Sequence, residues 1–249
     1  MTWLRRCLAA FCFLTIVPLP VSWSGTSEDL AGSPPFFPVV GLVLGCTAGA
    51  CSWILWQLLP PLVASVLLTG ILFSFSGALH LDGLADSADG LFSSRGRDRI
   101  LEIMRDSRVG AMGVIALVMI LILKISCLSV LSQGQAIRAA LLMPLAGRCG
   151  LVFMMAVLSY VRPDGGLGTL FYSRTFRAAA LISLIFLGLA GYLAQDVRGL
   201  IAVVMAMAVV FTFALFCRVK IGGATGDTLG AACELAEVCV ALVLAALAW

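Results

Sequence analysis

Long runs of apolar residues, separated by short polar segments, extend from one end of the chain to the other. A membrane-spanning helix requires about 20 mostly apolar residues. Seven runs meet or approach this length, and they cover residues 36–59, 61–81, 110–132, 138–160, 178–194, 199–217 and 230–248. The pattern therefore predicts an all-α, polytopic membrane bundle of about seven transmembrane helices, built as a single domain over residues 1–249.

The first apolar run, residues 7–20, is shorter than a membrane span and ends at Pro18 and Pro20. We expect it to form a short interfacial or re-entrant helix. The alternative is a signal peptide, because Arg5 and Arg6 precede the apolar residues, but no small-residue cleavage site follows them.

The composition supports a membrane protein and excludes several other classes. Hydrophobic residues make up 61% of the chain and charged residues 12%, whereas soluble domains contain about 25% charged residues. The arginines lie between apolar runs rather than in a basic stripe, so nucleic acid is not an expected partner. The nine cysteines lie mostly in apolar runs and are expected to be reduced. A single histidine, His80, excludes metal sites that require two.

Basic residues indicate the orientation of the bundle. Arginine and lysine concentrate in segments 82–109, 161–177 and 218–229, which seven spans would place on one side. The positive-inside rule assigns this side to the cytoplasm. Within the first span, glycines at 41, 45 and 49 repeat every four residues, a spacing that favours close helix packing and permits, without requiring, a homo-oligomer.

Acidic residues cluster after the second predicted span. Six of the thirteen lie between 82 and 106, and they are Asp82, Asp86, Asp89, Asp98, Glu102 and Asp106. On helices the first three share a face, and the last three recur at intervals of four. Carboxylates gathered on one face require a cation, and oxygen ligands alone suit Mg²⁺ or Mn²⁺. For residues 98–108 the alternative is a solvated loop in which acids pair with neighbouring arginines.

Two further polar clusters, 160–168 and 222–228, are expected on the same side. Glycines before a helix expose N–H groups that bind phosphate, although Thr225 or Asp227 could instead cap the last helix. A metal beside arginines is typical of phosphoryl transfer, and the alternative is an ion path. Arg148 and Lys124 lie within spans; Arg148 could reach an acid or a substrate phosphate, whereas no partner of Lys124 is evident.

The acidic run HLDGLADSADGL at 80–91 is followed by LEIMRDSRVG at 101–110 and GGATGDTLGA at 222–231. Together these segments resemble the adenosylcobinamide-GDP ribazoletransferase (cobalamin synthase) family, and the resemblance covers nearly the whole chain. It implies a bacterial inner-membrane enzyme with its acidic face in the cytoplasm. Such an enzyme joins adenosylcobinamide-GDP to α-ribazole or α-ribazole 5′-phosphate, releases GMP and requires Mg²⁺. Ser87 and Met112 differ from the commoner Thr and Phe.

The acidic face and the resemblance together assign roles to individual residues. The expected metal ligands are Asp82, Asp86, Asp89 and Asp106. The expected catalytic residues are Asp106, Asp86 and Asp89, with Asp106 as the general base. The expected substrate-binding residues are His80, Arg105, Arg108, Arg148, Arg162, Thr225, Asp227 and Glu234.

Two other functions remain open at the level of sequence. CDP-alcohol phosphotransferases share a D-x-x-D-G pattern with Asp86 to Gly90. In that family an Ala-Arg pair follows, whereas in this chain Ser-Ser precedes Arg95, so the arginine is misplaced. A transporter or channel is possible on hydropathy alone, although acids at the membrane edge favour an enzyme.

Overall fold

The computed structural model describes residues 2–17, 25–162, 167–172 and 176–248. Its main helices are α1 (Thr2–Leu14), α2 (Ser27–Ala31), α3 (Phe37–Leu58), α4 (Pro61–Ser74), α5 (Leu79–Leu91), α6 (Arg97–Ile103), α7 (Ala111–Ser129), α8 (Gln133–Val157), α9 (Leu167–Phe171), α10 (Arg177–Ile221) and α11 (Gly226–Ala246). In these described ranges β-type pairing is limited to an isolated bridge between Tyr160 and Ala224. The all-α prediction is confirmed.

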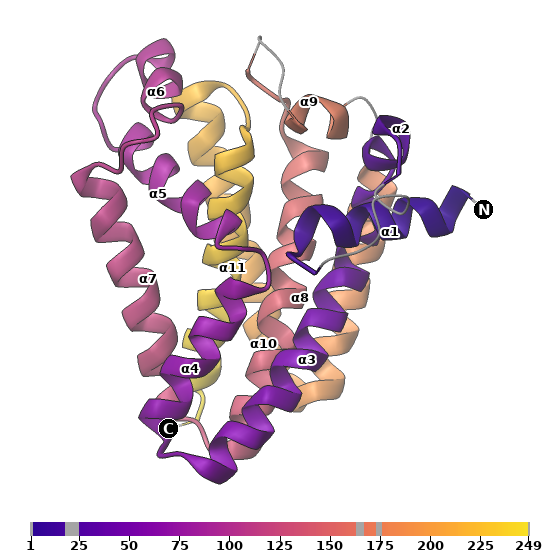
Figure 1. Ribbon diagram of the computed structural model, residues 1–249, viewed down its shortest axis with the longest axis vertical. Coiled ribbons are helices and arrows are strands. Elements are labelled where there is room, and N and C mark those ends of the chain that lie inside the picture. Colours follow the sequence, from indigo (N-terminus) through magenta and orange to yellow (C-terminus); the bar gives the residue numbers. More distant parts are fainter. Residues whose placement is uncertain (1, 18–24, 163–166, 173–175, 249) are drawn as a thin grey trace.

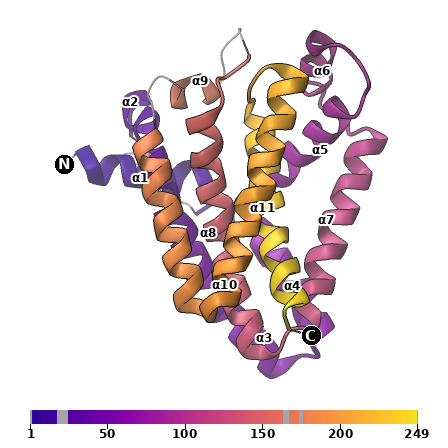
Figure 2. The same ribbon diagram turned by 180° about the vertical axis from the view of Figure 1, so that it is seen from behind.

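The long helices stand side by side as an upright bundle (Figure 1). Within the described residues, five helical segments are long and apolar enough to cross a membrane, and a sixth span results if the bent pair α4 and α5 is counted as one. Helix α10 counts as a single segment, yet its backbone leaves helical geometry at Gln195 and Asp196. Gly191 and Gly199 meet across this break, so its two halves fold back on each other (Figure 2). A polytopic bundle is thus confirmed, and seven spans stay a prediction.

The predicted span 61–81 is instead two helices joined by a sharp turn. Helix α4 ends at Ser74, α5 begins at Leu79, and the two are bent by 88°. The turn depends on left-handed backbone at Gly77 and Ala78, with φ of +59° and +62°. Ser74, Ser76 and Gly77 interrupt the apolar run only briefly, so the mean hydropathy of the segment stays high and does not reveal the turn. The acidic run therefore begins as helix α5 packed on α11 rather than as a solvated loop.

Helix α3 packs closely against the central helix α8. A Cβ atom at Gly45 would lie 2.2 Å from the carbonyl oxygen of Leu141, and one at Gly41 would lie 2.8 Å from that of Pro144. The repeated glycines therefore serve packing within the chain, as expected. Because α8 already covers this face of α3, the glycines offer no free surface for a homo-oligomer.

Helix α1 lies across the upright helices instead of parallel to them (Figure 1). Its 13 residues are too few to span a bilayer. Trp3 and Leu4 are exposed, whereas Ala9, Ala10 and Leu14 are buried. This arrangement agrees with the interfacial helix expected for the N-terminal run. The prolines at 18 and 20, predicted to end that run, lie outside the described residues.

The α3–α8 contact can be tested by adding a side chain at Gly45. We expect Gly45→Leu to destabilise the detergent-solubilised protein by about 1–3 kcal/mol, because the new atoms force the two backbones apart. Gly70→Leu on α4 is the control, since a Cβ atom there meets nothing within 4 Å. The melting temperature measures both, and an equal effect of the two changes would contradict the packing.

Candidate active site

The close crossing of α5 over α11 brings acidic residues from both helices together. A Cβ atom at Gly83 would lie 2.8 Å from the carbonyl oxygen of Asp227, and Gly230 faces the backbone of His80 in the same way. Only glycine permits this approach. As a result, the carboxylate of Asp86 is repelled by those of Asp227 and Asp82.

A basic residue reaches the same place from the segment after α8. The Ala224 N–H donates to the Ser159 carbonyl oxygen (2.8 Å), and the Val161 N–H donates to the Ala224 carbonyl oxygen (3.0 Å). This short pairing places the Arg162 guanidinium in an ion pair with Asp227. The predicted convergence of three polar clusters is therefore confirmed, although residues 163–166 of one cluster lie outside the described residues.

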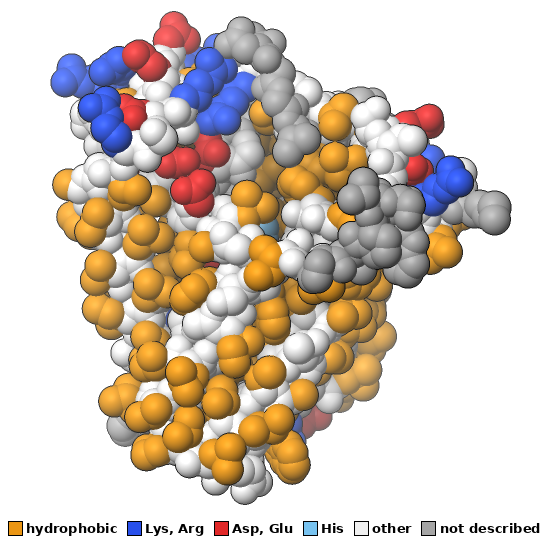
Figure 3. Space-filling model, viewed as in Figure 1, with side chains coloured by type: hydrophobic (Ala, Val, Ile, Leu, Met, Phe, Trp, Pro, Cys, Tyr) orange, Lys and Arg blue, Asp and Glu red, His pale blue; other side chains and the backbone are white. Residues whose placement is uncertain are grey.

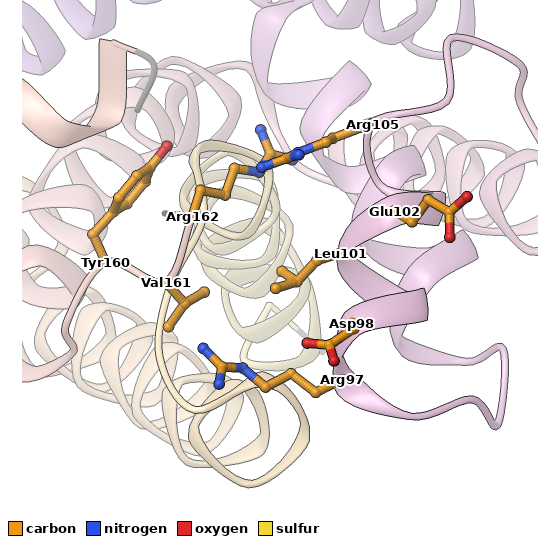
Figure 4. Close-up of a pocket in the computed structure, with 8 residues that line it drawn as sticks. All are labelled: Arg97, Asp98, Leu101, Glu102, Arg105, Tyr160, Val161 and Arg162. Carbon is orange, nitrogen blue, oxygen red and sulfur yellow. The ribbon is translucent and has the colours of Figure 1, made fainter. Parts of the chain in front are cut away.

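Two pockets meet at Arg162 and Tyr160, which line both of them. The larger has a volume of about 610 Å³ and lies between α6 and the segment after α8. Figure 4 shows its lining, which comprises Arg97, Asp98, Leu101, Glu102, Arg105, Tyr160, Val161 and Arg162. The structure thus brings together Arg105 and Arg162, two of the residues predicted to bind substrate. The sequence analysis did not identify Arg97 and Tyr160, which line the same pocket.

The smaller pocket, of about 250 Å³, lies deeper between α1, α3, α5, α8, α9 and α11. Asp82, Asp227 and His80 line it together with Arg162. His80 is buried, and its Nε2 atom has no hydrogen-bond partner in the described structure. Three of the predicted substrate-binding residues therefore share one cavity with a predicted metal ligand.

Asp89 lies on the expected face of α5 but already has backbone partners. Its carboxylate oxygens accept hydrogen bonds from the N–H groups of Gly110 (2.6 Å) and Gly113 (2.8 Å) at the start of α7. A Cβ atom at either position would approach the Asp89 carboxylate to 2.5 Å, so a larger residue there would displace that carboxylate. Asp89 therefore connects α5 to α7.

The second acidic group, on α6 and the segment after it, pairs with arginines. Glu102 contacts Arg99 at 2.6 Å, and both side chains are exposed. Asp106 contacts Arg108 at 2.7 Å, and these hydrogen bonds lower the pKa of Asp106 to about 2. The solvated, arginine-paired alternative describes these acids, and the structure does not bring Asp106 and Arg108 together with the acids of α5.

Arg148 and Glu234 lie in a buried ionic network within the bundle. Lys124 Nζ contacts Glu234 Oε2 at 2.7 Å and Glu237 Oε2 at 2.8 Å, while Arg148 Nη1 contacts Glu237 Oε1 at 2.6 Å. All four side chains are at most 4% exposed. Glu234 and Glu237 are therefore the partners of Lys124 that the sequence did not reveal. Arg148 and Glu234 lie in the interior of the bundle.

Thr225 serves as the N-cap of α11. Its hydroxyl accepts a hydrogen bond from the Thr228 N–H, and the Thr228 hydroxyl accepts one from the Thr225 N–H, so the two form a capping box. A Cβ atom at Gly223 would lie 2.1 Å from the Ser159 carbonyl oxygen. The capping alternative is therefore confirmed, and Gly223 serves chain packing.

The buried network should be costly to interrupt. We expect Lys124→Met to destabilise the protein by roughly 3–5 kcal/mol, because it leaves two buried glutamates without their shared cation. Lys220→Met is the matched control, since Lys220 lies 5.8 Å from the centre of the Phe216 ring and that contact is worth about 0.5–1 kcal/mol. Thermal unfolding in detergent measures both. Equal melting temperatures would refute the network as a stabilising element.

Comparison with known proteins identifies the family. Residues 6–245 match the cobalamin-5-phosphate synthase family. An adenosylcobinamide-GDP ribazoletransferase of Acetivibrio thermocellus is 39% identical over 94% of this chain and 95% of its own length. Proteins of the same name from Geotalea daltonii (39% identity, 98% of each chain) and Syntrophobacter fumaroxidans (38% identity, 92% and 93% of the chains) are also similar.

No solved structure matches the chain. The family match covers nearly the whole chain, from α1 to the end of α11, and therefore includes every helix that lines the two pockets. The chain is an enzyme of the cobalamin-5-phosphate synthase family.

Proposed function

We propose that this chain transfers the corrinoid-linked phosphate of adenosylcobinamide-GDP to α-ribazole or α-ribazole 5′-phosphate, with release of GMP. The observation that carries the proposal is the junction of the two pockets at Arg162, beside Asp82, Asp86 and Asp227. One pocket is rich in arginine and the other is mostly apolar. Two substrates entering from these two sides would meet next to the carboxylates.

Asp82, Asp86 and Asp227 are the residues best placed to hold Mg²⁺, with Mn²⁺ as the alternative. They offer oxygen atoms alone, which suits these hard cations. Asp82 and Asp86 form no ion pair with a described basic residue, and Asp86 is repelled by its acidic neighbours. Among the described residues no three side chains are close enough to form a ready-made metal site. Mg²⁺, when bound, would neutralise diphosphate oxygens.

The arginine-lined pocket suits the diphosphate of the corrinoid substrate. Arg97, Arg105 and Arg162 project toward the same space (Figure 4). Guanidinium groups bind phosphate oxygens through paired, charge-assisted hydrogen bonds. Arg162 would thus hold the diphosphate next to Asp227, its ion-pair partner.

The reaction requires that a ribose hydroxyl lose its proton. A new bond forms between the ribose oxygen and the corrinoid-linked phosphorus, while the bond from that phosphorus to the bridging oxygen breaks and GMP leaves. A carboxylate accepts the hydroxyl proton. Asp86 and Asp227 suit this step better than Asp106, because Arg108 holds Asp106 ionised with a pKa of about 2.

The charges also suggest how the enzyme sits in the membrane. Acidic and basic side chains gather at the end of the bundle that carries α5 and α6, above a largely apolar surface (Figure 3). We place this end on the cytoplasmic side of a bacterial inner membrane, in accordance with the positive-inside rule.

The reaction can be tested with protein purified in detergent or nanodiscs. Adenosylcobinamide-GDP, each form of α-ribazole and Mg²⁺ are supplied, and GMP and the joined corrinoid are followed with and without EDTA. We expect both products to appear in step and to stop with EDTA, because the metal neutralises the diphosphate. Folded protein that forms neither product with either acceptor would contradict the transferase.

Substitution separates the two acidic groups. We expect Asp86→Asn to lower kcat at least about 100-fold, because it removes a carboxylate from the reacting centre. Asp106→Asn, on the segment after α6 and outside the lining of both pockets, changes the same atoms and serves as the control, with an expected change below about 3-fold on the scale of a surface substitution. Steady-state GMP release measures both, and near-normal turnover of Asp86→Asn would remove that residue from the site.

The pH profile separates Asp86 from Asp106. A carboxyl group with a lowered pKa is ionised above that value, so Asp106 stays ionised from pH 5 to 9 and supplies no titration in that range. We expect Asp106→Asn to leave the acidic limb of kcat/KM at the same pH. A displaced or missing acidic limb in this variant would restore Asp106 as the general base.

A further inference from the structure

The smaller pocket contrasts with the arginine-lined one in the chemistry of its walls. Its buried end is formed by apolar side chains, of which Leu14, Phe37, Leu151 and Phe171 are at most 3% exposed. Its exposed end carries Asp82, with Arg162 and Asp227 partly exposed. A ligand that fits this cavity would therefore be apolar at one end and would place a polar group beside the carboxylates.

Three aromatic rings from distant parts of the chain form one side of the pocket. Phe13 comes from α1, Phe37 from α3 and Phe171 from α9. The Phe13 and Phe171 ring centres are 4.8 Å apart, and those of Phe37 and Phe171 are 5.8 Å apart in an edge-to-face arrangement. Such clustered rings favour a flat aromatic partner, which packs against their faces and edges.

The size of the pocket limits what can enter it. Its volume of about 250 Å³ lies below the range of roughly 300–1,000 Å³ that is usual for drug-sized ligands. A corrinoid is much too large for it. Guanine presents several donors and acceptors, whose burial among apolar side chains is costly. A compact, mainly apolar two-ring base fits both the size and the polarity.

Resting on the proposed function, we infer that this pocket binds the benzimidazole base of α-ribazole and selects the acceptor by that base. With the base against Phe37 and Phe171, the attached ribose lies toward Asp82 and Asp227, where the hydroxyl must react. His80 lines the same pocket, and its buried Nε2 atom is unpartnered. It offers a buried polar atom to the free ring nitrogen of the base. The other pocket is then left to the diphosphate substrate.

Titration calorimetry with α-ribazole as the probe tests the inference on the full-length protein in detergent. Met155→Phe fills the pocket from α8 and should weaken α-ribazole binding at least 10-fold. Met205→Phe is the matched control, because Met205 is 47% exposed on α10 and away from the pocket. Its dissociation constant should stay within 2-fold of that of the wild type. A correctly folded Met155→Phe that binds α-ribazole like the wild type overturns the inference.

A ligand series gives a readout that needs no folded variant. α-Ribazole carries two methyl groups on its benzimidazole, and a riboside that lacks both should bind the wild type at least roughly 10-fold more weakly, because an apolar pocket discriminates by methyl contacts. Adenosine should not compete with α-ribazole. Equal affinities for the methylated and unmethylated ribosides, or no binding of α-ribazole to the wild type, would overturn the pocket assignment.

The same proteins distinguish failure of the pocket from failure of the transferase. Suppose that the wild-type protein releases GMP and that Met155→Phe and Phe171→Leu both retain the wild-type KM for α-ribazole. This result overturns the pocket assignment and leaves the transferase function intact. Wild-type protein that binds α-ribazole, loses that binding in Met155→Phe and yet releases no GMP supports the pocket and refutes the transferase.

Discussion

Charges buried in an apolar bundle must neutralise one another, and this constraint underlies the arrangement of the helices. Lys124 on α7 and Arg148 on α8 meet Glu234 and Glu237 on α11, with all four side chains nearly inaccessible. An unpaired charge in this position is very costly. The pairing therefore favours one mutual arrangement of α7, α8 and α11. Helix α11 in turn carries Asp227 at its first turn, so the register of the buried charges also sets the position of a site residue.

The candidate active site lies where the backbones of α5 and α11 approach each other closely. Gly83 and Gly230 allow α5 to cross α11, while Asp89 connects α5 to the start of α7 through two backbone hydrogen bonds. The α4–α5 turn then directs the acidic helix into the bundle. These contacts bring carboxylates from separate helices together beside two pockets of different polarity.

The acids of α5 and those of α6 look alike in sequence but differ in surroundings. Both groups recur at helical spacing. Asp98, Glu102 and Asp106 have arginines within a few positions, and in the structure Glu102 and Asp106 pair with them. Asp82 and Asp86 lack such neighbours, and the absence of local cations was the signal that marked them. The role of Asp89 depends on residues 21 and 24 positions away, which spacing could not show.

Hydropathy and charge along the chain were enough to predict a lipid environment, an all-α bundle and the polar segments that gather at one end of it. Apolar runs of sufficient length and the scarcity of charge require a bilayer, and helices satisfy the backbone there. The bend before α5, the partner of Lys124 and the separation of Asp106 from the acids of α5 became evident only from the folded structure. Each of these depends on a contact between residues distant in sequence or on the path of the backbone. Local patterns of hydrophobicity and charge carry no information about either.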